Sequence, residues 1–170
     1  MAAGDIVGTI VQVVPPAADA ATPDIRAGGS TPAENVPCWD FDAIAIEYLD
    51  FLCFLHNYDD GGLTVETIVS ASSATSGVMV MEAAIRRFND DGEDIDAAHT
   101  YVYNRVEITA PSASGETVTG EIDFIDGSEM DSLAEGEWFV LRIRRDATGG
   151  DDIMAGDAEL IMPVIKEKAA

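Results

Sequence analysis

The sequence has few basic residues, and this shortage restricts the partners it can have. Only nine of its 170 residues are lysine or arginine, against 32 aspartates and glutamates, which gives a formal net charge of −23. Proteins that bind nucleic acid normally carry a basic patch, and anionic membrane surfaces attract lysine and arginine. The composition therefore predicts no direct nucleic-acid partner and no membrane partner.

Cysteine, histidine and long apolar runs are also scarce. Cys38 and Cys53 are the only cysteines; they match no zinc spacing and build no disulfide framework, and Cys53 is expected to be a buried free thiol. His56 and His99 lack the spacing of a metal pair. The apolar run near 51–55 is far shorter than the ~20 residues that span a bilayer, and no secretory signal is visible. We therefore expect a soluble intracellular product.

Recognisable catalytic motifs are missing as well. The sequence contains no G-x-S-x-G elbow, no P-loop and no G-x-G-x-x-G loop. Acid pairs such as Asp151 and Asp152 suit glycoside hydrolysis only at a separation that a sequence does not reveal, and so acidic a chain contains many such pairs. We therefore predict no enzyme activity, no catalytic residues and no cofactor.

Two features keep a ligand-binding alternative open. The acidic segment Asp90–Asp96 offers hard oxygen ligands but lacks the closing glutamate of an EF-hand, so a solvated loop is preferred to a weak Ca²⁺ or Mg²⁺ site and no metal ligand is assigned. Trp39 and Trp138 are residues that either stack on sugar rings or, more commonly, fill a core.

What the sequence has in abundance is acid, and the few basic residues are grouped. The negative charge indicates either solubility and adaptation to a saline medium, or a specific cationic partner surface. Five of the nine basic residues fall on two predicted strands. They either form a contact patch for a neighbouring subunit or pair with nearby acids of the same chain. This set is Arg86, Arg87, Arg142, Arg144 and Arg145.

Apolar and polar residues alternate along most of the chain from Trp39 onward, which is typical of half-buried strands. The predicted strands cover 39–43, 47–55, 63–69, 78–88, 101–110, 116–125, 137–145 and 157–166. Segment 78–88 fits a helix or a strand, and Gly77 before it, with no capping box, favours a strand. Ser128–Gly136 is predicted to be one or two helical turns, and Pro163 indicates an edge strand or a bulge. Eight such strands predict an all-β, eight-stranded jelly-roll β-sandwich.

The first 37 residues differ from the rest. A β-prone run ends at Pro15 and Pro16, and residues 17–37 are rich in Ala, Pro, Gly, Thr and Ser. The segment is either a flexible tail or an extended N-terminal arm that adds a strand to a partner's sheet. We divide the chain into an arm of 1–37 and a sandwich domain of 38–170. The arm's candidate contact residues are Ile6, Val7, Ile10, Val11, Val13, Val14, Ile25 and Arg26.

Several segments resemble, in the same order, those of a known protein family. They are Val36–Pro37, Trp39–Ala43, Asn57–Val65, Ser73–Gly77, Asp94–Asp96, Gly127–Leu133, Gly136–Glu137, Leu141–Asp146 and Met154–Leu160. Together they cover roughly residues 36–167 and are similar to small jelly-roll virion proteins from the structural-gene region of tailed bacteriophages, especially marine ones. The part before Asn35 is extra to the family pattern.

The resemblance implies a structural virion protein without enzyme activity. In such phages, similar proteins serve as capsid cement (decoration) proteins, commonly homotrimers that bind the major capsid protein on the outer capsid surface. We therefore expect that role and location, with the arm residues above and Arg86, Arg87, Arg142 and Arg144 as candidate contacts. The alternative that the same resemblance allows is a receptor- or glycan-binding jelly-roll module of the tail or its fibres, with Trp39 or Tyr58 as exposed contact residues.

Overall fold

The computed structural model describes residues 4–88 and 93–168, and in these ranges it consists almost entirely of antiparallel strands. The strands are β1 (Ile6–Val14), β2 (Thr22–Ala27), β3 (Asn35–Phe41), β4 (Tyr48–Leu55), β5 (Leu63–Ser70), β6 (Val78–Phe88), β7 (Asn104–Thr109), β8 (Val118–Phe124), β9 (Trp138–Arg145) and β10 (Ala158–Glu167). The eight strands predicted from Trp39 onward are all present, as β3 to β10. Within the described ranges no helix is long and apolar enough to cross a membrane.

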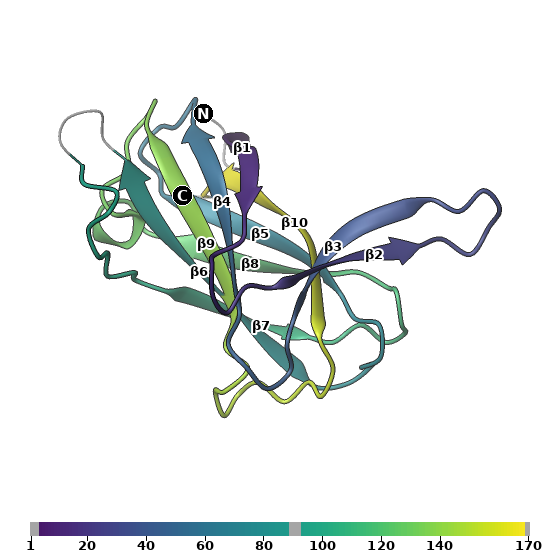
Figure 1. The fold of residues 1–170 in the computed structure, drawn as a ribbon. Helices are drawn as coiled ribbons and strands as arrows, with labels where there is room; N and C mark the ends of the chain where they lie inside the picture. Colours follow the sequence, from purple (N-terminus) through teal and green to yellow (C-terminus); the bar gives the residue numbers. More distant parts are fainter. Residues whose placement is uncertain (1–3, 89–92, 169–170) are drawn as a thin grey trace.

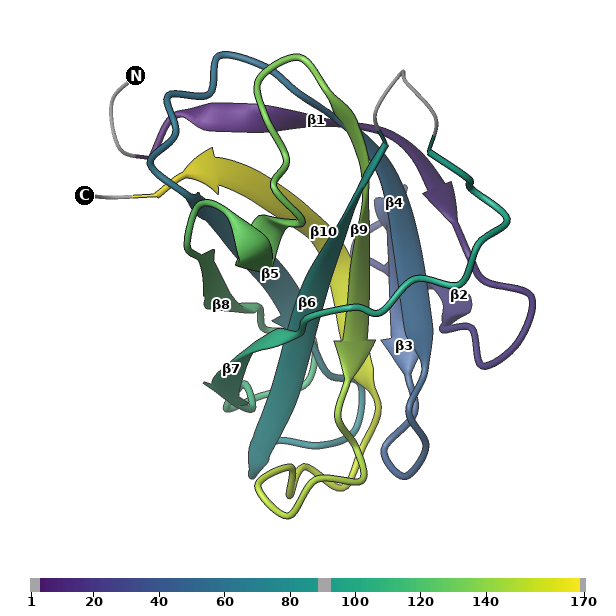
Figure 2. The ribbon, with the colours of Figure 1, turned by 90° about the vertical axis from the view of Figure 1, so that its left-hand side faces the viewer.

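The strands form the two layers of a sandwich (Figures 1 and 2). We call β1-β4-β9-β6-β7 the first sheet and β2-β3-β10-β5-β8 the second sheet. Strand β1 joins them, because Ile6 and Gly8 pair with the end of β10, while the rest of the strand pairs with β4. A side chain at Gly8 would collide with Ile165, so the crossing from one sheet to the other needs a glycine there.

The core lies between the two sheets and follows from the alternation along each strand. In β4, for example, Leu49, Phe51, Cys53 and Leu55 are buried, and the residues between them are half-buried on the outside. The largest apolar side chains in the interior include Phe41, Phe51, Phe124 and Phe139. Each such side chain contributes roughly 1.5–3 kcal/mol by leaving water, which is why the pattern determines which face of each strand is inside.

Strand β10 is the centre of the second sheet, which explains the position of Pro163. Along one side β10 pairs with β5. Along the other side it pairs with β3 through Leu160 and then with β1 from Ile165 onward. Pro163 lies in the interval that neither β3 nor β1 reaches, so its missing N–H interrupts no pair on that side. The predicted bulge is also present, as a register shift between Leu160 and Met162.

The N-terminal segment is part of the sandwich, which corrects the prediction of a separate arm over residues 1–37. Val7 is fully buried, and Ile10 and Val13 pack against the core, because β1 pairs with β4 and β10 of its own chain. Residues 22–27 form β2, which pairs with β3 across the proposed boundary at residue 37. What extends beyond the body is the hairpin of β2 and β3, which projects from the sandwich in Figure 1.

Two smaller predictions also differ from the structure. The helical segment of Ser128–Gly136 is only a 3-10 turn over Ser128–Met130, preceded by Gly127 without a side-chain cap. The strand predicted from Tyr101 begins at Asn104, and Val102, which the alternation along 101–110 would place inside, is 50% exposed. The reason is that the chain before β7 crosses the outside of the first sheet and does not extend it (Figure 2). Part of the acidic segment Asp90–Asp96 lies outside the described residues.

Candidate functional site

The outer face of the first sheet carries an aromatic row at one end. Trp138 on β9 lies directly between Phe54 on β4 and Phe88 on β6, and Thr9 on β1 continues the row. Directly opposite residues share a face, so all four side chains point outward. The Trp138 side chain is 44% exposed, and its ring centroid is 5.2 Å from that of Phe54. We call Phe54, Trp138 and Phe88 the aromatic row.

A shallow hollow and a set of polar groups border the aromatic row. The hollow has a volume of about 260 Å³ and is lined by Phe88, Gly136, Glu137 and Trp138. At the β1 end, Asn57 Nδ2 donates to His56 Nδ1 at 3.1 Å, and Nε2 of the same ring lies 2.8 Å from Thr9 Oγ1. Both ring nitrogens of His56 therefore have a hydrogen-bond partner, one on each side of the ring.

The other end of this face is a closed polar layer. Arg142 makes a two-point contact with Asp50, with both nitrogen–oxygen distances at 2.7 Å, and Arg144 pairs with Glu82. The segment before β7 places Tyr101 4.4 Å from the Arg142 guanidinium and Tyr103 3.8 Å from that of Arg144. These distances are those of cation–π contacts. The hydrogen bond to Asp50 raises the pKa of Arg142, and burial raises the pKa values of Tyr101 and Tyr103.

The predicted arginine patch is thus divided by the structure. Arg142 and Arg144 lie on the outer face and are paired with acids of the same chain. Arg86 shares that face and donates to the carbonyls of Asp94, Ile95 and Ala97. Arg87 contacts Ser132 and Glu93, and Arg145 is completely buried against Asp152. Of the two interpretations of the arginine set, a contact patch or pairing within the chain, the structure shows pairing within the chain for Arg142 and Arg144.

The apolar contact residues predicted in the first 37 residues have different environments. Val7 is buried, and Ile10 and Val13 are half-buried against the core. Those that remain exposed are Ile6 at 61%, Val11 at 55%, Val14 at 43% and Ile25 at 59%. Arg26 contacts Glu159 and Ser114, each at 3.3 Å.

Tyr58 and Trp39, predicted as possible sugar contacts, are not on the aromatic row. Tyr58 is only 7% exposed; its hydroxyl donates to Asp126 at 2.9 Å and accepts from Gly62, and burial together with Asp126 raises its pKa. It therefore closes the Asn57–Gly62 turn from inside. Trp39 is half-buried and packs against the core.

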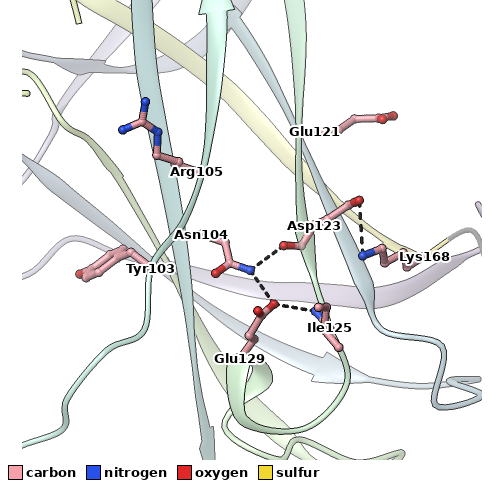
Figure 3. A pocket seen from close by; sticks show the side chains of 8 residues that line it. All are labelled: Tyr103, Asn104, Arg105, Glu121, Asp123, Ile125, Glu129 and Lys168. Atoms are coloured by element: carbon pink, nitrogen blue, oxygen red, sulfur yellow. Dashed lines mark hydrogen bonds and ion pairs between the residues drawn. The ribbon is translucent and has the colours of Figure 1, made fainter. Parts of the chain in front are cut away.

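A second, wider depression of about 600 Å³ lies between β7 and β8 (Figure 3). Its central groups bond to each other: Asn104 donates to the Asp123 carbonyl at 2.6 Å and to Glu129 at 2.8 Å, and the Ile125 N–H donates to the same Glu129 oxygen. Figure 3 shows Tyr103 and Arg105 pointing away from this network. These central donors and acceptors are therefore already paired with each other. Their hydrogen bonds connect β7 of the first sheet with β8 of the second sheet at this edge.

One group of side chains in the described ranges has the arrangement of metal ligands. Asp24, Cys38 and Asp40 lie on the outside of the second sheet, and their oxygen and sulfur atoms are all within 4.8 Å of one another. Burial, followed by the charges of Asp24 and Glu159, raises the pKa of Asp40 to about 6. Burial and the charge of Glu159 raise the pKa of Cys38 to about 11. This group has no spacing signal in the sequence, because the three residues come together only through strand pairing.

The comparisons with known proteins identify the fold. No protein-family model and no curated protein matches the chain. Among solved structures it is similar to the CBM22-1 xylan-binding domain of Paenibacillus barcinonensis Xyn10C, with 11% identity, a TM-score of 0.51, and coverage of 100% of this chain and 99% of that one. The family 11 carbohydrate-binding module from Clostridium thermocellum matches with 11% identity, a TM-score of 0.46, and coverage of 96% and 97%. The match to the CBM22-1 domain shows the predicted jelly-roll β-sandwich fold, with ten strands in the described residues where eight were predicted.

Proposed function

We propose that this protein is a non-catalytic jelly-roll binding module whose ligand is a neutral oligosaccharide, held on the aromatic row. The observation that carries the proposal is the outward-facing line across three adjacent strands in which Trp138, 44% exposed, stands between the half-buried Phe54 and Phe88. Contiguous apolar side chains on an outer surface are typical of a binding site. The match to a xylan-binding domain, which shows the fold alone, is consistent with this role.

The geometry of the row suits a sugar chain. Neighbouring strands are about 4.8 Å apart, so three rings across β4, β9 and β6 span about 10 Å, which fits an oligosaccharide better than one sugar ring. Because the rings stand on paired strands, little conformational freedom is lost on binding. The polar groups of Thr9, His56 and Asn57 border the row and are suited to hydrogen bonds with sugar hydroxyls.

The charge of the protein limits the class of glycan. With a net charge of −23, the surface repels polyanionic chains such as uronate-rich or sulfated glycans. Glu137 borders the hollow beside Trp138 and adds a negative charge at the site itself. The proposed ligand is therefore an uncharged chain, with hydroxyl groups for the polar border and flat ring faces for the aromatic row.

The test is a screen of neutral and anionic oligosaccharides on an array, followed by calorimetric titration of those that bind. The Trp138→Ala variant is expected to lose about tenfold or more in affinity, because stacking is worth about 1.5 kcal/mol. Trp39→Phe is the matched control: it should bind normally, and it leaves Trp138 as the only tryptophan, whose fluorescence then reports binding directly. No binding of any neutral glycan, or unchanged binding by Trp138→Ala, would contradict the proposal.

A second candidate, a capsid cement protein on the outer surface of a phage head, is supported by the family resemblance and by the projecting β2–β3 hairpin (Figure 1). Ile25 and Val36 on this hairpin are 59% and 41% exposed, which suits a segment that packs against a neighbouring protein. In this proposal the hairpin contacts the major capsid protein, and the protein acts as a homotrimer.

Electron microscopy of virions tests the second candidate. It predicts density for the protein on the head, and its loss when the hairpin tip between β2 and β3 is shortened. Density confined to the tail would instead favour the glycan-binding module, since attachment to a host surface is a task of the tail.

A further inference from the structure

Five polar side chains form a row across the outer face of the second sheet. Glu159 on β10 lies directly opposite Asp40 on β3 and opposite Ser70 on β5. Cys38 is two residues before Asp40 on β3, and Asp24 on β2 lies directly opposite Cys38. Opposite residues and residues two apart on a strand share a face, so all five side chains point to the same side.

Three atoms of this row are buried without a hydrogen-bond partner. They are Glu159 Oε2, Asp40 Oδ1 and Ser70 Oγ, and in the described part of the chain only one other side-chain atom, Arg87 Nε, is in that condition. The Glu159 side chain is only 1% exposed and stands beside the Asp40 carboxylate. A buried carboxylate oxygen without a partner is costly, so three orphaned oxygens in one row point to a missing ligand.

The charges of the row do not balance. Asp24, Asp40 and Glu159 supply three negative charges, and the one cation in contact is Arg26, whose Nη1 lies 3.3 Å from Glu159 Oε1. Three minus one leaves an excess of two negative charges, and a Cys38 thiolate makes the excess three, so the row attracts a cation. Arg26 binds Oε1 of Glu159 and leaves the buried Oε2 without a partner beside Asp40, which adds to this attraction.

The donor atoms indicate which kind of cation fits. Zn²⁺ is bound by thiolate sulfur at about 2.3 Å and by carboxylate oxygen at about 2.0–2.2 Å, so donors around one ion are at most about 4.5 Å apart. The donor atoms of Asp24, Cys38 and Asp40 are within 4.8 Å of one another, which small rotations bring into range. A thiolate in the set favours the zinc type over Ca²⁺ and Mg²⁺, which prefer oxygen alone.

We propose that Asp24, Cys38 and Asp40 form a site for one divalent transition-metal ion of the zinc type, with the buried Glu159 carboxylate beside Asp40 as a neighbouring negative charge. The ion would connect β2 and β3, next to β10 at the centre of the second sheet, and so would fix the two strands of the projecting hairpin to each other. This site lies on the opposite sheet from the aromatic row, and it does not depend on whether that row binds a glycan.

The first test is titration of the full chain, without a histidine tag and after removal of metal by a chelator, with Zn²⁺ and with Co²⁺. We expect one ion per chain and, for Co²⁺, the near-ultraviolet absorption of a thiolate bound to cobalt. Cys38→Ser should remove this absorption, whereas Cys53→Ala, the matched cysteine control in the core, should keep it. Absence of binding, or an absorption that survives Cys38→Ser, would overturn the proposal.

The second test separates the site from the general acidity of the surface. Asp40→Asn removes a charged ligand and is expected to lower Zn²⁺ affinity at least about tenfold, because changing only an outer partner of a metal ligand already has an effect of that size. Glu121→Gln, which removes an exposed acid on β8, should leave affinity unchanged. Equal losses in both variants, or Ca²⁺ binding as tight as Zn²⁺ binding, would show nonspecific attraction and overturn the proposal.

Discussion

The outer faces of the two sheets use acidic residues in opposite ways. On the first sheet, Asp50 lies directly opposite Arg142, and Glu82 directly opposite Arg144, so each carboxylate has a guanidinium as its cross-strand neighbour. On the second sheet, Asp40 lies directly opposite Glu159. Opposite charges in these positions stabilise a sheet and like charges destabilise it. The register of the strands, more than the number of acids, therefore determines whether a carboxylate supports the fold or opposes it.

The first and largest expected effect comes from breaking a pair on the first sheet. Arg142→Met leaves Asp50, whose side chain is 15% exposed, without its partner, and should lower the free energy of unfolding by about 3 kcal/mol. Urea denaturation at pH 7 measures it. Arg105→Met is the control, because Arg105 is 44% exposed and pairs only with exposed acids, so no measurable loss is expected. Equal losses for the two variants would refute the contrast between buried and exposed pairs.

The second prediction concerns Asp40 and has the opposite sign. Burial and the neighbouring charges of Asp24 and Glu159 raise its pKa to about 6, so the folded state holds this proton more tightly than the unfolded state. The contribution of this proton to the free energy of unfolding is fully present below pH ~4 and is lost as the pH rises through 6. In metal-free protein, Asp40→Asn should therefore raise the free energy of unfolding by about 1 kcal/mol at pH 7.5 and leave it unchanged at pH 4. The value of about 1 kcal/mol already includes a reduction for the partial exposure of the Asp40 carboxyl.

Metal sharpens this second prediction. A ligand that binds only the folded state stabilises it, so saturating Zn²⁺ should make the unchanged protein more stable than Asp40→Asn. Chemical denaturation of both proteins at both pH values, with and without Zn²⁺, gives the difference in free energy of unfolding between them under each of the four conditions. If Asp40→Asn destabilises the metal-free protein at pH 7.5, the carboxylates of the second sheet are not in conflict and the comparison of the two faces does not hold.

The smallest expected effect tests the tyrosines that cover the first sheet. Tyr103 lies 3.8 Å from the Arg144 guanidinium, and Tyr103→Leu keeps an apolar side chain while removing the aromatic face. The expected loss is about 0.5 kcal/mol, the usual size of a partly exposed cation–π contact. Thermal unfolding in matched buffers is sensitive enough, and Tyr103→Phe is the control that should lose almost nothing.

Much of the fold could be predicted from the sequence, because alternation is a local signal. The strand at 78–88 was predicted with its observed bounds, and β3 to β10 all correspond to predicted strands. The partners of β1 were not predictable, because an apolar residue such as Val7 indicates that the strand is buried but not which strands it pairs with. Strand β2 was missed because it contains Pro23 and lies between Ala20–Ala21 and Gly28–Gly29, a composition more typical of irregular chain.

The candidate sites could be predicted less well, since both depend on register. That Trp138 stands between two phenylalanines follows from the pairing of β9 with β4 and β6. That Asp40 faces Glu159 follows from the pairing of β3 with β10, which are far apart in the sequence. Pairing over such separations is decided by the whole set of contacts. The alternation along β9 places Trp138 on the same outward face as Arg142 and Arg144, whereas the burial of Tyr58 in a turn had no local signal.

The central position of β10 has a consequence for how the protein is made. This strand supplies partners for β1, β3 and β5, yet it is the last of the ten to leave the ribosome. Until it arrives, those three strands expose unpaired edges, which are templates for aggregation. Folding is therefore expected to be completed only after β10 has been synthesised, on the order of milliseconds to seconds later, as for other sandwiches with distant pairings. A chain that stops before Ala158 should accumulate as aggregate.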